Sequence, residues 1–159
     1  MRPKQDVRAA LAEEAEASHS LHRKVGELLG LKSSIASEVD LVDRLEKGLP
    51  AGVVQTLRTR AGFSDEEIYQ LIAPRRTLHR REAEQQVLSR DEADRVVRVA
   101  RIAARAQRVF SAKPVYAMEW LRMAQRPLGD RTPIQLLVSD AGARLVEELL
   151  TGIEHGQFG

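Results

Sequence analysis

The 159-residue chain contains no cysteine and few aromatic residues, which make up 4% of it. Without cysteine, neither a disulfide nor a thiolate metal site can form. The four histidines lack acidic neighbours at metal-ligand spacing, so no metal site is expected. No run of about 18 apolar residues is present to cross a membrane, and the N-terminus is too acidic for a signal peptide. We therefore expect a cytoplasmic protein with no metal, cofactor or membrane segment.

Positive charge is concentrated in the middle of the chain. Residues 75–113 hold 11 Lys/Arg against 5 Asp/Glu, whereas residues 1–74 and 114–159 each carry a net charge of −2. A segregation of this kind favours a polyanionic partner such as nucleic acid, and it also suits an acidic protein surface. The length allows one or two compact domains.

The spacing of apolar residues predicts an all-α fold. No segment alternates apolar and polar residues as a strand would, and no Asn-Gly or Asp-Gly hairpin turn occurs. Apolar residues recur instead at intervals of three and four, the spacing of one helix face. One such buried stripe is expected after Gly30, at Ile35, Val39, Val42 and Leu45.

Three serines mark expected helix starts. Ser64 and Ser89 each precede a glutamate by three residues, a pattern in which the two side chains satisfy each other's backbone amides. Ser139 stands before a third amphipathic segment. Since these serines are explained as caps and no other catalytic pattern is found, we do not expect an enzyme. The predicted helices cover residues 65–73, 90–110 and 140–155.

The predicted helix over residues 90–110 is apolar on two sides. We therefore expect other elements to cover it on both of them. Its remaining side carries arginines at intervals of three or four, which places them in one polar stripe. These are Arg95, Arg98, Arg101, Arg105 and Arg108.

The segment APRRTLHRREAE, residues 73–84, places four arginines and a histidine within seven positions. A short capped helix, a break at Pro74 and a basic second helix match the helix-turn-helix arrangement, in which the second helix lies in the major groove of DNA. The alternative is the solvated face of a helical bundle. The candidate DNA-binding residues are Arg75, Arg76, Thr77, His79, Arg80 and Arg81.

Several fragments, taken in order, resemble a known family. Together they are similar to antitoxins of the Xre/MbcA/ParS type over roughly residues 45–157. The resemblance implies an Xre-like helix-turn-helix domain over residues 34–88 and a helical toxin-binding domain over residues 89–159, usually assembled as a homodimer. The fragments are Arg76–Arg81, Leu88–Arg95, Ala106–Phe110, Trp120-Leu121, Pro127–Gly129, Pro133–Leu137, Gly142, Val146-Glu147, Leu149-Leu150 and Ile153–Gly156.

The resemblance also implies a partner, which is a RES-domain toxin that consumes NAD or transfers its ADP-ribose. The antitoxin would cover the toxin's active site and bind promoter DNA. A stand-alone helix-turn-helix repressor is the competing function. The single tryptophan is more often a core anchor between helices than a partner contact, and the last residues of the chain can equally fray. The residues expected to bind the toxin are Trp120, Leu121, Glu154, His155, Gly156 and Phe158.

Residues 1–33 fall outside the resemblance and are expected to form an N-terminal helical extension. The segment is rich in alanine and glutamate. Two interpretations stay open, since this helix can pack on the core or mediate self-association. His19 and His22, three residues apart on its polar side, are expected to be exposed to solvent.

Overall fold

The computed structural model describes residues 3–111 and 113–157 and confirms the all-α fold. Within these residues there is no strand, and only two isolated β-bridges occur, Pro50 with Val87 and Gln125 with Arg131. A short 3-10 helix, η1, covers Arg126–Leu128. The α-helices are α1 (Pro3–Leu29), α2 (Glu38–Lys47), α3 (Gly52–Ala61), α4 (Asp65–Leu71), α5 (Arg75–Ala83), α6 (Arg90–Val109), α7 (Pro114–Arg122), α8 (Pro133–Leu136) and α9 (Asp140–Glu154).

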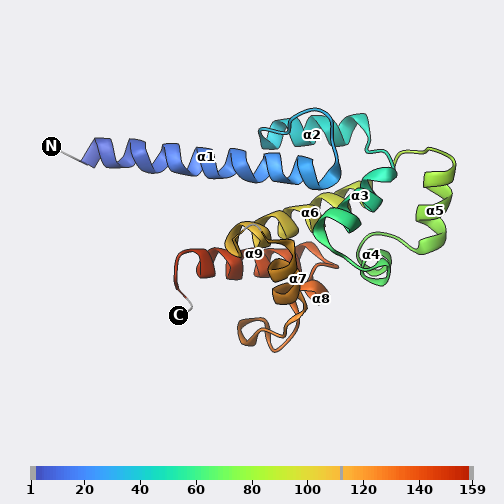
Figure 1. Ribbon diagram of the computed structural model, residues 1–159. Helices are drawn as coiled ribbons and strands as arrows, with labels where there is room; N and C mark the ends of the chain where they lie inside the picture. Colours follow the sequence, from blue (N-terminus) through green and yellow to red (C-terminus); the bar gives the residue numbers. More distant parts are fainter. Residues whose placement is uncertain (1–2, 112, 158–159) are drawn as a thin grey trace.

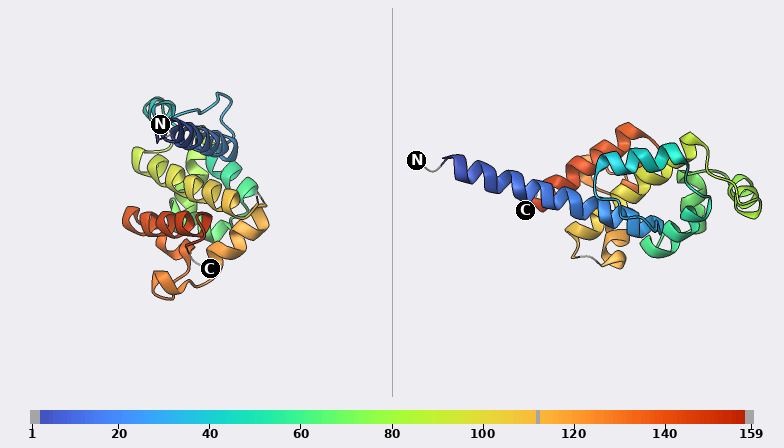
Figure 2. Two further views of the ribbon diagram at one scale, coloured as in Figure 1. Left: turned by 90° about the vertical axis from the view of Figure 1, so that its left-hand side faces the viewer. Right: turned by 90° about the horizontal axis from the view of Figure 1, so that it is seen from above.

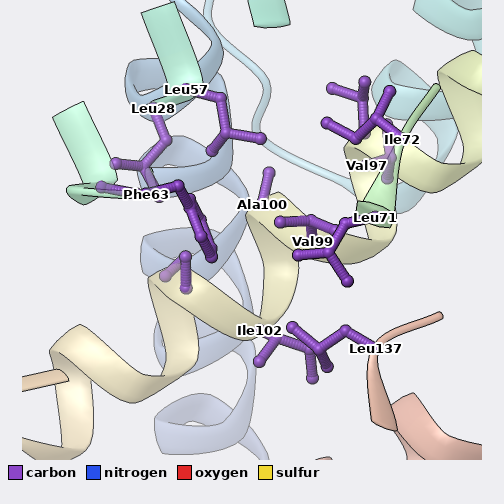
Figure 3. Close-up of a cluster of buried hydrophobic side chains, with 14 of the residues drawn as sticks. Leu28, Leu57, Phe63, Leu71, Ile72, Val97, Val99, Ala100, Ile102 and Leu137 are labelled. Carbon is purple, nitrogen blue, oxygen red and sulfur yellow. The ribbon is translucent and has the colours of Figure 1, made fainter. Parts of the chain in front are cut away.

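The central element is α6, which packs against α1, α2, α3, α7 and α9 (Figure 1). As expected, it is covered on more than one side. Val99 and Ile102 of this helix lie among side chains from segments distant in sequence, Leu71 and Leu137 (Figure 3). Buried side chains from Val25 to Leu150 belong to one hydrophobic cluster. The two predicted domains therefore share a continuous core.

The predicted helix starts are confirmed by their hydrogen bonds. Ser64 and Ser89 each form the expected capping box, with their hydroxyls accepting from the amides of Glu67 and Glu92 at 3.1 and 3.2 Å. Ser139 accepts from an amide in the first turn of α9. One end is shifted, because α4 stops at Leu71, two residues before the predicted end.

The predicted stripe around α2 is wrong in part. Ile35 is buried, but Val39 is 67% exposed and Val42 45% exposed. The cause is the helix start, since a capping box at Ser37 begins α2 at Glu38, after Ile35. Periodicity counted from Ile35 therefore does not continue into the helix. The face that meets the core carries Leu41 instead, which is fully buried.

Helix α1 contacts the rest of the described chain mainly through its second half. Residues 6–20 are exposed, and this half projects away from the other helices (Figures 1 and 2). The second half packs on α3 and α6 through buried Val25, Leu28 and Leu29. Packing on the core thus accounts for only half of the extension. None of the described helices is long and apolar enough to cross a membrane.

Of the two α1 histidines, His19 is exposed as expected, but the expectation for His22 is wrong. The His22 side chain is 13% exposed, and its Nε2 lies 2.9 Å from a Glu38 carboxylate oxygen. Its Nδ1 lies 2.7 Å from the Ser18 carbonyl oxygen. The carboxylate comes from α2, a neighbour that helical spacing within α1 does not reveal.

Gly142, at the start of α9, is predicted to be intolerant of any side chain. A Cβ there would overlap the carbonyl oxygen of Leu136, with the carbonyl carbon 2.9 Å away. Because that contact is with backbone, we expect Gly142→Ala to lower the free energy of unfolding by about 2–3 kcal/mol. Gly52→Ala is the matched control, since no atom lies within 4 Å of its Cβ position. Chemical denaturation of both variants tests this, and equal stabilities would contradict it.

Candidate functional site

Helices α4 and α5 form the predicted two-helix arrangement. Three residues, Ile72 to Pro74, join them, and Pro74 stands at the N-cap of α5. Helix α5 lies at the end of the molecule opposite the projecting half of α1 (Figures 1 and 2). Leu78 is its only buried residue. The rest of α5 therefore offers a polar, accessible surface, as a helix entering a DNA groove would require.

Three of the candidate arginines are available to an outside partner. Arg75, Arg76 and Arg80 are exposed. Within the described part of the chain they form no ion pair. Exposed, unneutralised guanidinium groups on one short helix are the feature that binds phosphate oxygens.

The other three candidates are engaged within the fold. Thr77 is half-buried, and the His79 ring is edge-on to Tyr69, with Nε2 3.4 Å from the phenol oxygen. Arg81 is also half-buried, because its Nε lies 2.7 Å from a carboxylate oxygen of Glu92 at the start of α6. The basic segment therefore divides into free and committed side chains.

The predicted arginine stripe of α6 is largely engaged in contacts within the fold. Three of its five members form ion pairs with neighbouring helices, and Arg95 donates to the Ile72 carbonyl oxygen at 3.0 Å. The positive charges of Arg98, Arg101 and Arg108 are thus neutralised by carboxylates within the fold. The ion pairs are Arg98–Asp140, Arg101–Glu38 and Arg108–Glu154.

Helix α7 carries an exposed apolar face that the sequence analysis did not single out. Val115 is 65% exposed, Tyr116 50% and Met123 60%. Trp120, which was singled out, is half-buried against Phe110, with ring centroids 5.5 Å apart. No signal in the sequence marked this outer face, because Val115 and Tyr116 could equally have faced the core.

Leu121 is fully buried, so in this conformation it supports the α7 surface from beneath and touches no partner. This reflects helix geometry, because the side chain next to Trp120 points about 100° away around the axis. Its proposed part in toxin binding is therefore restricted to an indirect one.

The end of α9 is tied down by several contacts. Glu154 pairs with Arg108 on α6, at 3.0 Å, and His155 Nδ1 lies 2.8 Å from the Thr151 carbonyl oxygen. Gly156 has φ +69°, the left-handed conformation that often follows the end of a helix. Phe158 lies outside the described residues.

A bidentate ion pair joins α4 to α7. Arg122 donates to both carboxylate oxygens of Glu67, at 2.8 and 2.9 Å, and to the Gly62 carbonyl oxygen at 3.0 Å. Burial alone raises the pKa of Glu67, but hydrogen bonds from Arg122 and Ser64 outweigh it, so the pKa is lowered. The same pairing raises the pKa of Arg122. Within the described residues, no cluster of three or more metal-ligating side chains occurs.

Known protein families match both parts of the chain. Residues 40–101 match the antitoxin Xre-like helix-turn-helix domain, and residues 105–156 match the antitoxin Xre/MbcA/ParS C-terminal toxin-binding domain. The two matches meet within α6, whereas we predicted a boundary before it.

Three curated relatives, each called Antitoxin Xre, are similar over most of their length. The protein from Pseudomonas putida is 33% identical over 138 residues, which are 87% of this chain and 85% of that protein. The relative from Yersinia enterocolitica is 29% identical, over 74% of this chain and 80% of its own. The relative from Photorhabdus laumondii is 28% identical, over 80% of this chain and 86% of its own length.

The fold and these matches define an antitoxin of a toxin–antitoxin system, with a helix-turn-helix domain and a toxin partner. The chain belongs to the Xre/MbcA/ParS antitoxin family. Proteins of this family regulate and bind rather than catalyse, which agrees with the expectation that the chain is not an enzyme. The toxin-binding domain also favours this function over a stand-alone repressor.

The Glu67–Arg122 pair predicts a pH-dependent contribution to stability. Because the folded pKa of Glu67 lies below its ordinary value of 4.5, this stabilisation is complete above that pH and is lost as pH falls through the lowered folded pKa. Glu67→Gln should lower the free energy of unfolding by about 1 kcal/mol at neutral pH, a modest value because Arg122 is half exposed. The difference in the free energy of unfolding between the wild type and Glu67→Gln should vanish at acid pH. Urea denaturation across pH tests this, with exposed Glu66→Gln as the control; a constant difference at all pH values would contradict it.

Proposed function

We propose that this antitoxin neutralises a RES-domain toxin, which consumes NAD or transfers its ADP-ribose, by covering the toxin's active site. The observation that carries the proposal is the outer face of α7, within the toxin-binding domain, where Val115 and Tyr116 of the helix and Met123, the residue that follows it, are exposed. Aromatic and methionine side chains are enriched in the buried centres of protein interfaces. This face has the composition expected of an interface centre.

The proposal gives the sequence-predicted toxin-binding residues two different roles. Trp120 lies at the edge of the α7 face, and Leu121 supports that face from below. The C-terminal segment, from Glu154 through His155 and Gly156 to Phe158, is proposed to enter the active site. A pocket for the phosphates of NAD must offer cations, which suit a carboxylate such as that of Glu154. Glu154 can join only after leaving Arg108.

Charged substitutions on the α7 face should abolish toxin binding. We expect Tyr116→Asp/Met123→Asp to raise the Kd for a purified RES-domain toxin by at least about 100-fold, since each buries an unpaired charge in the interface. Val39→Asp is the matched control, because Val39 is equally exposed but lies on α2. Calorimetry measures the Kd, and helicity by circular dichroism checks the fold.

Unchanged affinity of the α7 variant would contradict the assignment of this face to toxin binding.

Complexes of the antitoxin with the RES-domain toxin also test the role of the C-terminal segment. Removing residues 156–159 keeps the Glu154–Arg108 pair, so affinity should fall by only a few-fold while NAD turnover by the toxin returns. Full inhibition by the truncated chain would show that the body of the domain blocks the site.

We also propose that a homodimer regulates its own promoter through α5. The support is the exposure of Arg75, Arg76 and Arg80 on the second helix of the α4–α5 arrangement, within the matched helix-turn-helix domain. Two copies would present two such helices to half-sites about one helical turn apart. The projecting half of α1, with Val7 and Leu11 exposed, offers a surface for pairing two copies.

Loss of the free arginines should change the salt dependence of DNA binding. For each phosphate contact removed by Arg75→Ala, Arg76→Ala or Arg80→Ala, the slope of log K against log salt should fall by about 0.9. Arg126→Ala, exposed in η1, should leave the slope unchanged. Fluorescence anisotropy on a promoter duplex gives the slopes, and the saturation point should show two chains per duplex. Identical slopes would make these arginines a solvated face.

A further inference from the structure

Arg81, unlike Arg75, Arg76 and Arg80 on the same helix, forms an ion pair within the described part of the chain. Its side chain is 20% exposed, and the Glu92 side chain that it meets is 9% exposed. The Nε atom lies 2.7 Å from Glu92 Oε2, but its N–H is not directed at that oxygen, so the contact is an ion pair rather than a well-aligned hydrogen bond. Shielding from solvent strengthens such an attraction.

Glu92 is also held in place by a contact that does not involve Arg81. Its Oε2 accepts from the Ser89 amide at 2.8 Å, which is half of the capping box that begins α6. The carboxylate is therefore part of the first turn of the central helix. An arginine bound to it is tied to the most deeply packed element of the molecule.

Few other contacts hold α5 against the body. Leu78 is its only buried side chain, and its polar surface faces outward. The chain just before α5 is tied to α6 by Arg95, which donates to the Ile72 carbonyl oxygen at 3.0 Å. Arg81, in the last turns of α5, supplies the corresponding tie near the other end. The start of α6 thus holds α5 from both ends.

We propose that Arg81 is a positioning residue, which orients α5 on α6 through Glu92 and is not one of the DNA contacts. The inference rests on the proposed DNA binding by α5. It divides the basic segment by role, because Arg75, Arg76 and Arg80 meet phosphates while Arg81 sets the angle at which they do so.

The variant Glu92→Gln separates the two roles of Arg81. Glutamine can still accept from the Ser89 amide, and position 92 is too buried to meet DNA, being 7% exposed. If Arg81 positions α5, Glu92→Gln and Arg81→Gln should each weaken promoter binding about fivefold to tenfold with the salt slope unchanged, and the double variant should be no worse than either. Arg81→Lys should recover part of the affinity. Arg80→Gln should instead lower the slope by about 0.9 for each phosphate that the side chain no longer meets.

A different pattern would overturn the inference. If Arg81 contacts phosphate, Glu92→Gln frees it and leaves affinity equal or higher, while Arg81→Gln lowers the slope as Arg80→Gln does. Arg98→Gln is the matched control, because it breaks another ion pair of α6, with Asp140, away from α5. Its promoter affinity should equal that of the wild type.

The inference stays testable if the wild type binds no duplex, which would overturn the proposed DNA binding. Hydrogen exchange of the α5 backbone amides then decides it. Glu92→Gln and Arg81→Gln should speed exchange in α5 but not in α3, and Arg98→Gln should do neither. Unchanged exchange in α5 would show that the ion pair does not hold the helix.

Discussion

The packing of α6 is the constraint on which the rest of the structure depends. Small buried side chains such as Ala100 and Ala103 let neighbouring helices approach closely, and larger ones such as Val96 and Ile102 fill the space between them. Because the helix is covered on several sides, α1, α3, α7 and α9 are arranged around it. A change in the position of α6 would therefore move both matched domains together.

The polar side of α6 also holds neighbouring helices in place, through ion pairs. Arg98 pairs with Asp140 on α9, and Arg101 pairs with Glu38 on α2. Glu38 receives both Arg101 and His22; burial raises its pKa, but these partners outweigh that effect and lower it. One carboxylate thus joins α1, α2 and α6. Several of the charges that make the middle of the chain basic thus hold helices together, whereas Arg75, Arg76 and Arg80 on α5 remain exposed to an outside partner.

The sequence was sufficient for local structure and insufficient for contacts between distant segments. Capping signals at Ser64 and Ser89 predicted helix starts because both partners lie within four residues. Periodicity also predicted that α6 is covered on two sides. It could not show that Arg101 meets Glu38, 63 residues away, or that His22, which was expected to be exposed, meets the same carboxylate.

The candidate surfaces also differ in how far the sequence alone revealed them. The basic cluster was found because its residues are consecutive, and Trp120 was found because it is the single tryptophan. The exposed face of α7 was missed, since an apolar residue looks the same in sequence whether it faces the core or solvent. A helix that must bind DNA has to stay polar, so little apolar contact remains to fix its orientation. Under the proposed function, its angle depends on charged side chains anchored in the core helix, and the sequence alone cannot distinguish Arg81, which meets Glu92, from the arginines proposed to contact DNA.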